Sequence, residues 1–591
     1  MPPDIELRRF AGLFTDTADI EGEMDRLIRA ENVMFDQDGV VQARHGFHLF
    51  SNAENAETAL VFLGKSEIFF QRILASLNFY YLWEGGKTSP SLNKILVTVT
   101  SGSRTTNVVT LNVTPSSHGI VIGDQITVNV ADATYNGLFT VTGVGAGTVQ
   151  YSQVLANDAA SGAGTFALKP KGVFGGNTGV EYNTKVYFPE GRYWDGGGIR
   201  DTPQIPDPGQ QGYMAVHAER LWLLKSSSQS RLYFSNPGAP EVWPAANFID
   251  IDGGAGSLPA GLMSYQGRLY IFKREDIFVL DTPGLPSTWI LRRFARIGCQ
   301  PESIKEYNGT VYWVAGDGAY RFDGTTIEKL SDAIDDVFKS REPFAAGFGT
   351  AESALFRDQW VIRFFIDDLT ARNFCFNVKT EQWSEWVFPW ETDNVFPVNI
   401  WSEPRGVIAA DEHIESGIYM TTANLVAGTE GLLLGTEIRT NDYWRDETGT
   451  HIAPPTTTEH TFNVSLQTKF SEFGDPTLYK RVHWWMFEWE GQNVLVEQVQ
   501  SDRGRVTRAA PGAELHGAEK VFSRTLPGNI NHPDRSPGDV FTDSIKGLGM
   551  TRKMSLRITA LDIRDVGFKL YRIAGKVVPR GTVRRGSDQV T

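Results

Sequence analysis

The residue types that most often do chemistry occur in this chain without the spacing that chemistry needs. Two acidic pairs stand out, Asp335 with Asp336 and Asp367 with Asp368. Paired carboxylates can act as acid and base on a glycosidic bond when they face each other across a substrate. Residues 249–254 also resemble the start of a calcium loop, but the later carboxylates and the closing glutamate of that motif are missing. We interpret residues 249–254 as a turn. The first acidic pair is expected in a short helical segment and the second in a hairpin turn, both solvated, and we predict no metal site.

Other catalytic signatures are missing from the sequence. There is no Gly-x-x-x-x-Gly-Lys phosphate loop, no His-Glu-x-x-His, no Cys-x-x-Cys and no Gly-x-Ser-x-Gly. Cys299 and Cys375 lie in strand-like runs, which indicates buried thiols and no disulfide. We therefore predict no enzyme activity, no cofactor and no catalytic residue. The alternative is a carbohydrate-binding or carbohydrate-cleaving protein that acts on a cell-surface polysaccharide, and its carboxylates would converge only in the fold.

The elements that position these residues are short strands repeated along the chain. Residues 265–282 run from the turn dipeptide Gln266-Gly267 through an apolar strand, a polar turn and a second strand, and residues 307–324 repeat the pattern. A strand, a tight turn and a second strand make a β-hairpin, which cannot bury its apolar faces alone. Repeated hairpins therefore have to stack around a shared core.

The spacing of this repeat indicates the fold. The phrase ends on an apolar residue followed by Asp, Asn or Ser, and from residue 194 onward it recurs in steps of 40, 46, 42, 54 and 43 residues. A four-stranded propeller blade takes about 40–50 residues. The chain is therefore predicted to be all-β, with a β-propeller of about seven blades. A large β-sandwich is the alternative.

Composition divides the chain of 591 residues into four parts. Residues 1–93 are expected to be an N-terminal segment with the first blades. In it, a short helix over Thr17–Ala30 precedes two strands at 31–47 that close the propeller. Residues 94–168 have only five charged side chains. They are expected to form an inserted small β-sandwich or barrel, which is either a contact module or a neutral decoration. The propeller resumes over 169–425.

The last part, residues 426–591, is predicted to be a C-terminal β-domain with a basic tail. Residues 461–591 have 20 Lys and Arg against 14 Asp and Glu, a net charge of +6, although the net charge of the whole chain is −14. Residues 1–460 are therefore at −20, and most of the surface would repel a phosphate backbone. No apolar run is long enough to span a membrane, and the N-terminus lacks the features of a signal peptide. We expect synthesis in a cytoplasm.

Several sequence segments within the predicted blades resemble those of a known protein family. The runs ENVMFDQDGVVQARHGF, ERLWLLKSSSQSRLYFSNPGAPEVW, GRLYIFKREDIFVLDT and GTVYWVAGDGAYRFDGTTIEKLSDAI look like those of the tail nozzle proteins of short-tailed bacteriophages. The resemblance covers about residues 30–50 and 180–425. Family nozzles form a hexameric ring below the portal and its adaptor, and enclose the channel through which the genome leaves. The insert and the long C-terminal loop depart from any specific member.

The resemblance implies a structural virion protein of the tail, assembled in the host cytoplasm. Its partners would be five further copies of itself, the portal adaptor, tail fibres or tailspikes and a tail needle or plug. Double-stranded DNA would pass through the lumen without sequence-specific binding. An acidic lumen suits that passage, because it offers DNA no phosphate-binding stations.

Two sets of residues follow from this hypothesis. Acidic loops between blades should line the channel, and the candidates are Asp250, Asp252, Asp332, Asp335 and Asp336. Contacts between subunits are expected from the aromatic strand at 483–489 and from the strands at 552–573, because a basic segment beside an acidic body favours head-to-tail contact. The inter-subunit candidates are Trp485, Phe487, Trp489, Arg552, Lys553 and Arg557.

Overall fold

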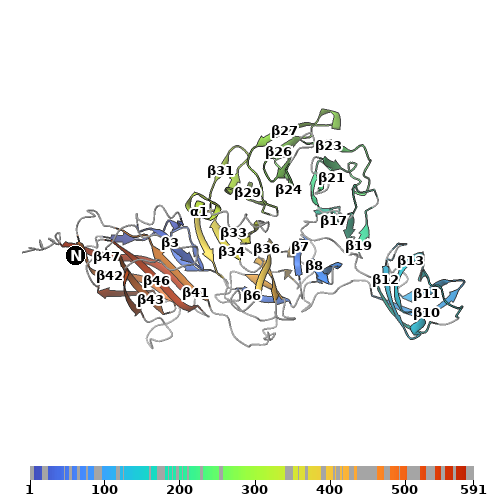
Figure 1. Ribbon diagram of the computed structural model, residues 1–591, viewed down its shortest axis with the longest axis horizontal. Helices are drawn as coiled ribbons and strands as arrows, with labels where there is room; N and C mark the ends of the chain where they lie inside the picture. The colour runs from blue at the N-terminus through green and yellow to red at the C-terminus, as the bar shows by residue number, and fades with distance from the viewer. Residues whose placement is uncertain are drawn as a thin grey trace, which may run out of the picture.

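The computed structural model describes most strands of the chain and many of the turns between them. Besides shorter gaps, the stretches outside the described part are residues 1–4, 16–23, 85–95, 169–179, 340–350, 436–461, 502–518, 527–539 and 581–591. For the strands between residues 47 and 84 and between 395 and 435, the backbone alone is described. A ring of sheets lies between a small barrel and a two-sheet sandwich (Figure 1).

Four consecutive antiparallel sheets form the clearest part of the ring, each with four strands in sequence order. The first contains β16 (Val180–Tyr182), β17 (Lys185–Phe188), β18 (Arg192–Trp194) and β19 (Ile199–Asp201). The second contains β20 (Gly212–His217), β21 (Arg220–Lys225), β22 (Arg231–Phe234) and β23 (Phe248–Asp250). The third contains β24 (Pro259–Tyr265), β25 (Arg268–Lys273), β26 (Ile277–Asp281) and β27 (Ile290–Ala295). The fourth contains β28 (Lys305–Tyr307), β29 (Thr310–Ala315), β30 (Gly318–Phe322) and β31 (Ile327–Lys329).

The central strands are apolar on both faces because each sheet is covered on both sides. Along β25, Leu269 and Ile271 pack into a cluster with Trp222 of the preceding sheet. The alternate residues Tyr270 and Phe272 pack into a different cluster, together with Val311, Trp313 and other side chains of the following sheet. Side chains of a strand alternate between its faces, so a strand buried on both faces has a continuous apolar run. This stacking of sheets face to face is the packing of propeller blades.

Three further sheets complete the ring. One contains β32 (Ala351–Phe356), β33 (Gln359–Phe365), β34 (Ala371–Asn377) and β35 (Gln382–Trp386). The next contains β36 (Val395–Glu403), β39 (Gly417–Asn424), β40 (Gly431–Gly435) and β6 (Phe47–Ser51), beside the small hairpin of β37 (Gly406–Val407) and β38 (His413–Ile414). The last contains β7 (Ala56–Phe62), β8 (Glu67–Leu74) and β9 (Leu77–Glu84). Strand β36 contacts both β32 and β7, so the last blade meets the first. In the described part of the chain the ring therefore has seven sheets, and the protein is an all-β propeller.

The strand that closes the ring differs from the expected one. Strand β6 pairs with β40 as the outer strand of the last blade, which covers an otherwise open sheet edge. The expected closing strands, at 31–47, instead form β4 (Val33–Phe35) and β5 (Val41–Ala43), and β5 pairs with β47 (Phe568–Arg580) of the C-terminal domain. The expectation was wrong because closure uses the next strand along the chain.

The helix expected over Thr17–Ala30 is wrong where the structure describes it. Residues 26–31 form strand β3 (Arg26–Glu31), which pairs with β41 (Phe462–Thr468). Leu27 and Ala30 are fully buried in the core, so tertiary packing and sheet hydrogen bonds outweigh the local helical preference.

The inserted domain is a closed six-stranded barrel spanning residues 96–168, against the expected 94–168. Its strand order is β10-β11-β14-β13-β12-β15, and it closes because β15 pairs with both β10 and β12. Buried Arg104 fixes one loop by donating to the carbonyl of Ala156 at 2.7 Å and to Gln153 at 2.8 Å. The elements are β10 (Leu96–Thr105), β11 (Val108–Thr114), β12 (Gln125–Val130), the 3-10 turn η2 (Ala133–Tyr135), β13 (Gly137–Gly145), β14 (Thr148–Ser152) and β15 (Gly164–Leu168).

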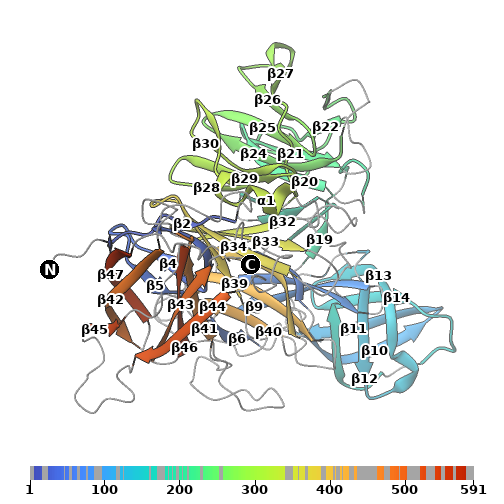
Figure 2. The same ribbon diagram turned by 60° about the vertical axis from the view of Figure 1, so that its left-hand side comes forward.

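The C-terminal domain is a sandwich to which the N-terminus contributes strands. One sheet has the order β4-β5-β47-β42-β45, with β1 (Ile5–Leu7) on β47. The other has the order β3-β41-β46-β43-β44, with β2 (Gly12–Leu13) on β3. Figure 2 shows the blue N-terminal strands beside the red C-terminal ones. The remaining strands are β42 (Tyr479–Gly491), β43 (Val494–Ser501), β44 (Glu519–Leu526), β45 (Phe541–Lys546) and β46 (Lys553–Ile563).

The aromatic strand predicted to contact a neighbouring subunit is instead part of this core. Trp485, Phe487 and Trp489 are 0%, 1% and 1% exposed and belong to one hydrophobic cluster with residues of the facing sheet. The inter-subunit prediction for these three residues is therefore wrong. An aromatic strand face can cover its own domain or a partner, and here the N-terminal strands and the second sheet cover it.

The structure describes the basic residues predicted to contact another subunit to different extents. Arg557 donates to Gln467 at 3.1 Å and to Glu497 at 3.4 Å on strands beside its own, so it connects three strands of one sheet, and its role in a subunit contact stays a prediction. Lys553 begins β46, where the backbone alone is described, and Arg552 lies outside the described residues.

The four-part division needs correction at both ends. The propeller continues past the expected boundary at 425, because β40 (Gly431–Gly435) is a blade strand. Strands β1 to β5, between residues 5 and 43, belong with the C-terminal sandwich rather than with the first blades. The sandwich therefore contains both ends of the described chain.

One turn of the propeller is strained, and we expect that relieving it stabilises the protein. Ala218 and Glu219 connect β20 to β21 with φ values of 47° and 58°. This left-handed region costs residues other than glycine roughly 1–2 kcal/mol each. The corresponding turn Asn308-Gly309 has the residue types preferred there. Replacing Glu219 by glycine should raise the free energy of unfolding by about 1 kcal/mol in urea denaturation.

The contacts around this turn are kept in that variant. The Glu219 carbonyl accepts from Tyr182 at 2.9 Å and from the Gly238 amide at 2.8 Å, and both bonds use backbone that glycine retains. Glu306→Gly on β28 is the matched control, because φ is negative there and glycine should cost about 0.5–1 kcal/mol. Equal losses from both variants would contradict the strain argument.

Candidate functional site at the junction of propeller and sandwich

One continuous sheet joins the propeller to the sandwich. Strand β35 of the propeller pairs in parallel with β3 at Glu385 and Glu31, and β3 pairs with β41 of the sandwich. Ten strands, from β32 to β44 and including β2, therefore belong to one sheet that spans both parts. Contacts between domains of one chain usually permit relative motion. A shared sheet opposes that motion, because bending it would break backbone hydrogen bonds.

A common hydrophobic core reinforces this sheet. One cluster of buried side chains contains Trp360 and Trp383 of the propeller together with Leu27, Leu466 and Trp485 of the sandwich. Burial of a large side chain contributes about 1.5–3 kcal/mol. The cluster therefore stabilises the two parts as one unit.

Asn32 is the polar centre of the junction. It is 4% exposed and has a φ of 57°, a backbone conformation that asparagine tolerates better than most residues. Its amide Nδ2 donates to the carbonyl of Asn463 in the sandwich at 2.9 Å. Its Oδ1 accepts from the backbone amide of Val387, at the end of the propeller blade, at 2.8 Å. The backbone amide of Asn32 donates to the backbone carbonyl of Glu385 at 2.7 Å. A single side chain therefore bonds both parts.

Two arginines surround Asn32 and its partner strand. Arg44, 1% exposed, donates from Nε to Asn32 Oδ1 at 2.9 Å and from Nη2 to the Val387 carbonyl at 3.3 Å. Arg372 donates to both oxygens of Glu385, at 2.8 and 3.0 Å. Burial opposes the charged form of Arg372, but the carboxylate of Glu385 outweighs this and raises the pKa of Arg372. Such bidentate pairs fix geometry as well as charge.

Sequence reasoning missed Asn32 and Arg44. An asparagine between strand residues Glu31 and Val33 is a weak signal, because asparagine often marks a break in an extended backbone. No local pattern shows that its partners are Val387 and Asn463, which are hundreds of residues further along the chain.

Three of the acidic channel candidates lie near this junction. They belong to the 3-10 turn η4 (Asp332–Ile334) and helix α1 (Asp335–Lys339), which follow the last strand of one blade. Asp335 pairs with Lys329 at 2.6 Å and with Lys339 at 2.5 Å. Partial burial opposes ionisation of Asp335, yet the two lysines lower its pKa. Asp336 accepts from the hydroxyl of Thr15, and the Thr15 amide donates to Ala333 at 2.9 Å.

Asp335 and Asp336 therefore have partners within the chain, and their place in a channel lining stays a prediction. Asp332 stays open to solvent, with a side chain 83% exposed. Asp250 lies elsewhere, on the outer strand β23 of another blade, where it pairs with Arg231 at 3.3 Å. Asp252 lies outside the described residues. The structure therefore does not bring the five candidates together.

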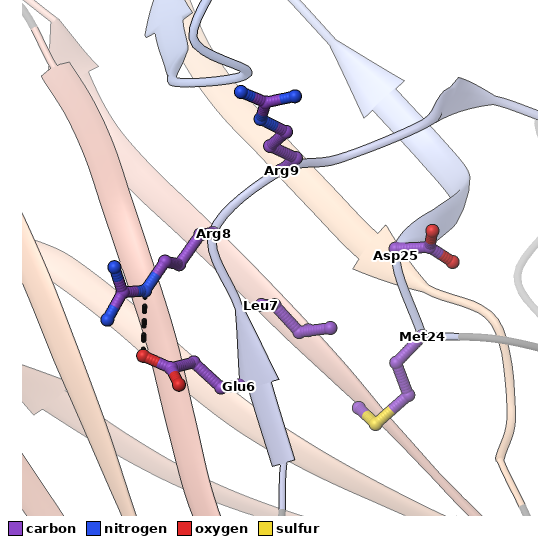
Figure 3. Close-up of a pocket in the computed structure, with 6 residues that line it drawn as sticks. All are labelled: Glu6, Leu7, Arg8, Arg9, Met24 and Asp25. Atoms are coloured by element: carbon purple, nitrogen blue, oxygen red, sulfur yellow. Dashed lines mark hydrogen bonds and ion pairs between the residues drawn. The ribbon is translucent and has the colours of Figure 1, made fainter.

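A pocket of about 510 Å³ lies at the N-terminal segment (Figure 3). Arg8 donates to Glu6 at 2.8 Å, which lowers the pKa of that carboxyl, and Arg572 also pairs with Glu6 at 2.6 Å. Oδ1 of Asp25 is buried without a hydrogen-bond partner among the described residues. The lining contains two arginines and two carboxylates, so its charges alone select no ligand class. The lining residues are Glu6, Leu7, Arg8, Arg9, Met24 and Asp25.

The cysteines are buried free thiols, as predicted. Burial raises the pKa of Cys299 to about 12 and raises that of Cys375 as well. A thiol that stays protonated is a poor nucleophile. Across the residues that the structure describes, no three His, Cys, Asp or Glu side chains gather as a metal site.

His217 connects two blades of the propeller. Its Nδ1 lies 2.8 Å from the hydroxyl of Ser264, and its Nε2 lies 2.8 Å from that of Thr282, both on the next blade. Burial lowers the pKa of His217, because a charged ring is costly away from water. The neutral ring has one donor and one acceptor nitrogen, which suits two hydroxyl partners.

This lowered pKa predicts a pH dependence of stability. Below the ordinary pKa near 6.5, the unfolded chain binds a proton that the folded ring resists. The contribution of His217 should be fully present above about pH 6.5 and should fall as the pH drops toward the folded pKa. Urea denaturation from pH 7.5 to 5 should therefore show a steeper loss in the wild type than in His217→Gln. An equal slope for both proteins would contradict the prediction, and exposed His483→Gln is the matched control.

No protein-family model and no curated protein matches this chain. Among solved structures, it is similar to Raptor of Chaetomium thermophilum, with 9% identity over 67% of this chain and a TM-score of 0.33, and it spans 29% of that chain. It is also similar to BamB from Moraxella catarrhalis, with 11% identity over 64% of this chain and 95% of BamB, at a TM-score of 0.24. It is also similar to an exo-β-1,3-galactanase from Phanerochaete chrysosporium, with 9% identity over 62% of this chain and 95% of the galactanase chain, at a TM-score of 0.21. These similarities are too distant to indicate an activity.

In the described part of the chain, no helix is long and apolar enough to cross a membrane.

Proposed function

We propose that this protein is a structural subunit of a short-tailed phage tail, a nozzle whose ring of copies encloses a channel for DNA. The observation that supports it best is the sheet of ten strands shared by propeller and sandwich. A conduit subunit has to keep the width of its channel while other proteins bind at its ends. Movement between its domains would change that width, and the shared sheet opposes this movement. The resemblance of the blade phrases to tail nozzle proteins supports the same role.

The charge of the chain suits this role. Six copies at −14 each give −84 for a hexamer. A negatively charged lumen would have no binding sites for DNA phosphates, so DNA passing through it would meet little friction. The innermost strands of a single propeller leave too narrow a hole for a duplex. DNA would therefore pass along the axis of the ring, outside every propeller.

Electron microscopy of the purified full-length protein, alone and with the adaptor ring of the same virion, tests the proposal. We expect rings of one fixed subunit number, a channel wider than a DNA duplex and a predominantly acidic lining. Monomers under all conditions, or a lumen lined by Lys and Arg, would contradict the conduit role. Release of reducing ends from host polysaccharide by the same preparation would favour the carbohydrate-active alternative.

A further inference from the structure

The outer edge of the blade β24–β27 has a basic and apolar surface. Strand β27 pairs with β26 on one side only, so among the described residues the other side of its backbone is open. Figures 1 and 2 both show β27 at the rim of the propeller, away from the sandwich and the barrel. Leu285, in the loop before the 3-10 turn η3 (Pro286–Thr288), and Ile290 are 72% and 58% exposed. The basic rim is the surface formed by Leu285, Ile290, Arg292, Arg293 and Arg296.

The charges of this surface favour a protein partner over a nucleic acid. Residues 259–300 have six basic and three acidic side chains, a net of +3 in a chain of −14. Arg292 and Arg293 pair with carboxylates of the same blade, at 3.7 and 3.2 Å, so their charge is partly offset. Arg296 has no ion pair among the described residues. Phosphate binding needs clustered cations, whereas arginine beside exposed aliphatic side chains is typical of protein interfaces.

The neighbouring blade has a surface of opposite charge. Residues 305–339 have four basic and seven acidic side chains, a net of −3. Arg321 pairs with Glu328 at 2.8 Å and with Glu381 at 2.6 Å, and one guanidinium cannot neutralise two carboxylates. The side chains of Glu328 and Glu381 are 54% and 55% exposed. Glu328 lies on β31, which pairs with β30 alone in the described part of the chain. The acidic rim is the surface formed by Asp323, Glu328 and Glu381.

We propose that the basic rim of one copy binds the acidic rim of the next copy. The inference rests on the proposed role as a ring subunit and names the contact that builds the ring. Opposite charges on two exposed outer strands are complementary. The exposed aliphatic side chains add apolar area at the centre of the contact. The open edge of β27 can also accept backbone hydrogen bonds from the partner strand.

In the proposed ring the contact joins two different surfaces of successive copies, which makes it head-to-tail. Such contacts repeat from copy to copy and close into a ring when the rotation between copies permits. Within one copy, the described residues make no ion pair between the two rims. The surfaces are therefore available to a second copy. This contact replaces the aromatic strand of the sandwich, which the fold uses for its own core.

Charge reversal in the full-length chain tests the inference by sedimentation velocity. Arg292→Glu and Arg296→Glu should each weaken self-association roughly tenfold, since each places like charges together. Arg231→Glu is the matched control, because its side chain is 48% exposed, against 49% for Arg292, and it also pairs with a carboxylate of its own blade. Combining Arg296→Glu with Glu328→Lys should restore association that either change alone weakens. High salt should weaken the wild type.

The possible outcomes distinguish a failure of the rim contact from a failure of the proposed nozzle role. If the wild type assembles into rings and the two rim variants do so equally well, the rim contact is wrong and the nozzle role stands. An equal loss in Arg231→Glu, or no restoration by the paired reversal, would also contradict the rim contact. If the wild type stays monomeric at every concentration, alone and with the adaptor ring, both proposals fail. Unchanged circular dichroism and melting temperature of each variant exclude misfolding as the cause.

Discussion

Replacing Trp485 by alanine is expected to lower the free energy of unfolding of the sandwich by about 3–5 kcal/mol. The side chain is fully buried between the two sheets, and its indole donates to Gln498 at 3.4 Å. Its cross-strand partner is Gly575, where an added Cβ would lie 2.4 Å from the indole ring. The ring therefore occupies the space above that glycine, and no neighbouring side chain can fill it after truncation. Urea denaturation followed by circular dichroism measures the loss.

His483→Ala on the same strand is the matched control. His483 points to the exposed face, so its truncation should change stability by less than about 0.5 kcal/mol. If Trp485→Ala kept its stability and lost self-association instead, the aromatic strand would be an interface after all. That result would overturn the account of this strand as part of the core.

Replacing Asn32 by alanine is expected to cost about 3 kcal/mol and to separate the unfolding of the propeller from that of the sandwich. The change removes the acceptor of the buried Arg44 guanidinium and of the Val387 amide, and the donor to Asn463. An unsatisfied buried group costs about 1–3 kcal/mol. Alanine at a φ of 57° adds roughly 1–2 kcal/mol.

Two further variants separate the hydrogen bonds from the backbone strain. Asn32→Gly removes the side-chain bonds but tolerates the backbone, so it should be more stable than Asn32→Ala by about 1 kcal/mol. Asn32→Asp keeps the acceptor toward Arg44 and Val387 but places an oxygen against the Asn463 carbonyl, so it tests the loss of that one donor. Calorimetry should show one transition for the wild type and two for Asn32→Ala. A single transition in every variant would contradict the role of Asn32 in joining the two parts.

The sequence by itself determined the local elements of this protein. Turn dipeptides such as Gln266-Gly267 and Asn308-Gly309 adopt the positive φ that tight hairpins need. The apolar run Leu269–Phe272 is buried on both sides, as a strand between two sheets must be. The repeat spacing of these hairpins was enough to predict an all-β propeller. The low charge of residues 94–168 was enough to separate the barrel from the blades. These signals are readable because hairpin formation depends on neighbours in the sequence.

Only the tertiary structure decided how distant segments combine. Strand β5 of the β4–β5 hairpin pairs with β47 rather than closing the ring, because strand pairing depends on which distant edge is free. The aromatic face of β42 is the same in a core as in an interface, and only the covering sheet distinguishes them. Asp335 and Asp336 read as free carboxylates until the fold places Lys329 and Thr15 beside them. The charge of a side chain is local, but its use depends on partners brought close by the fold.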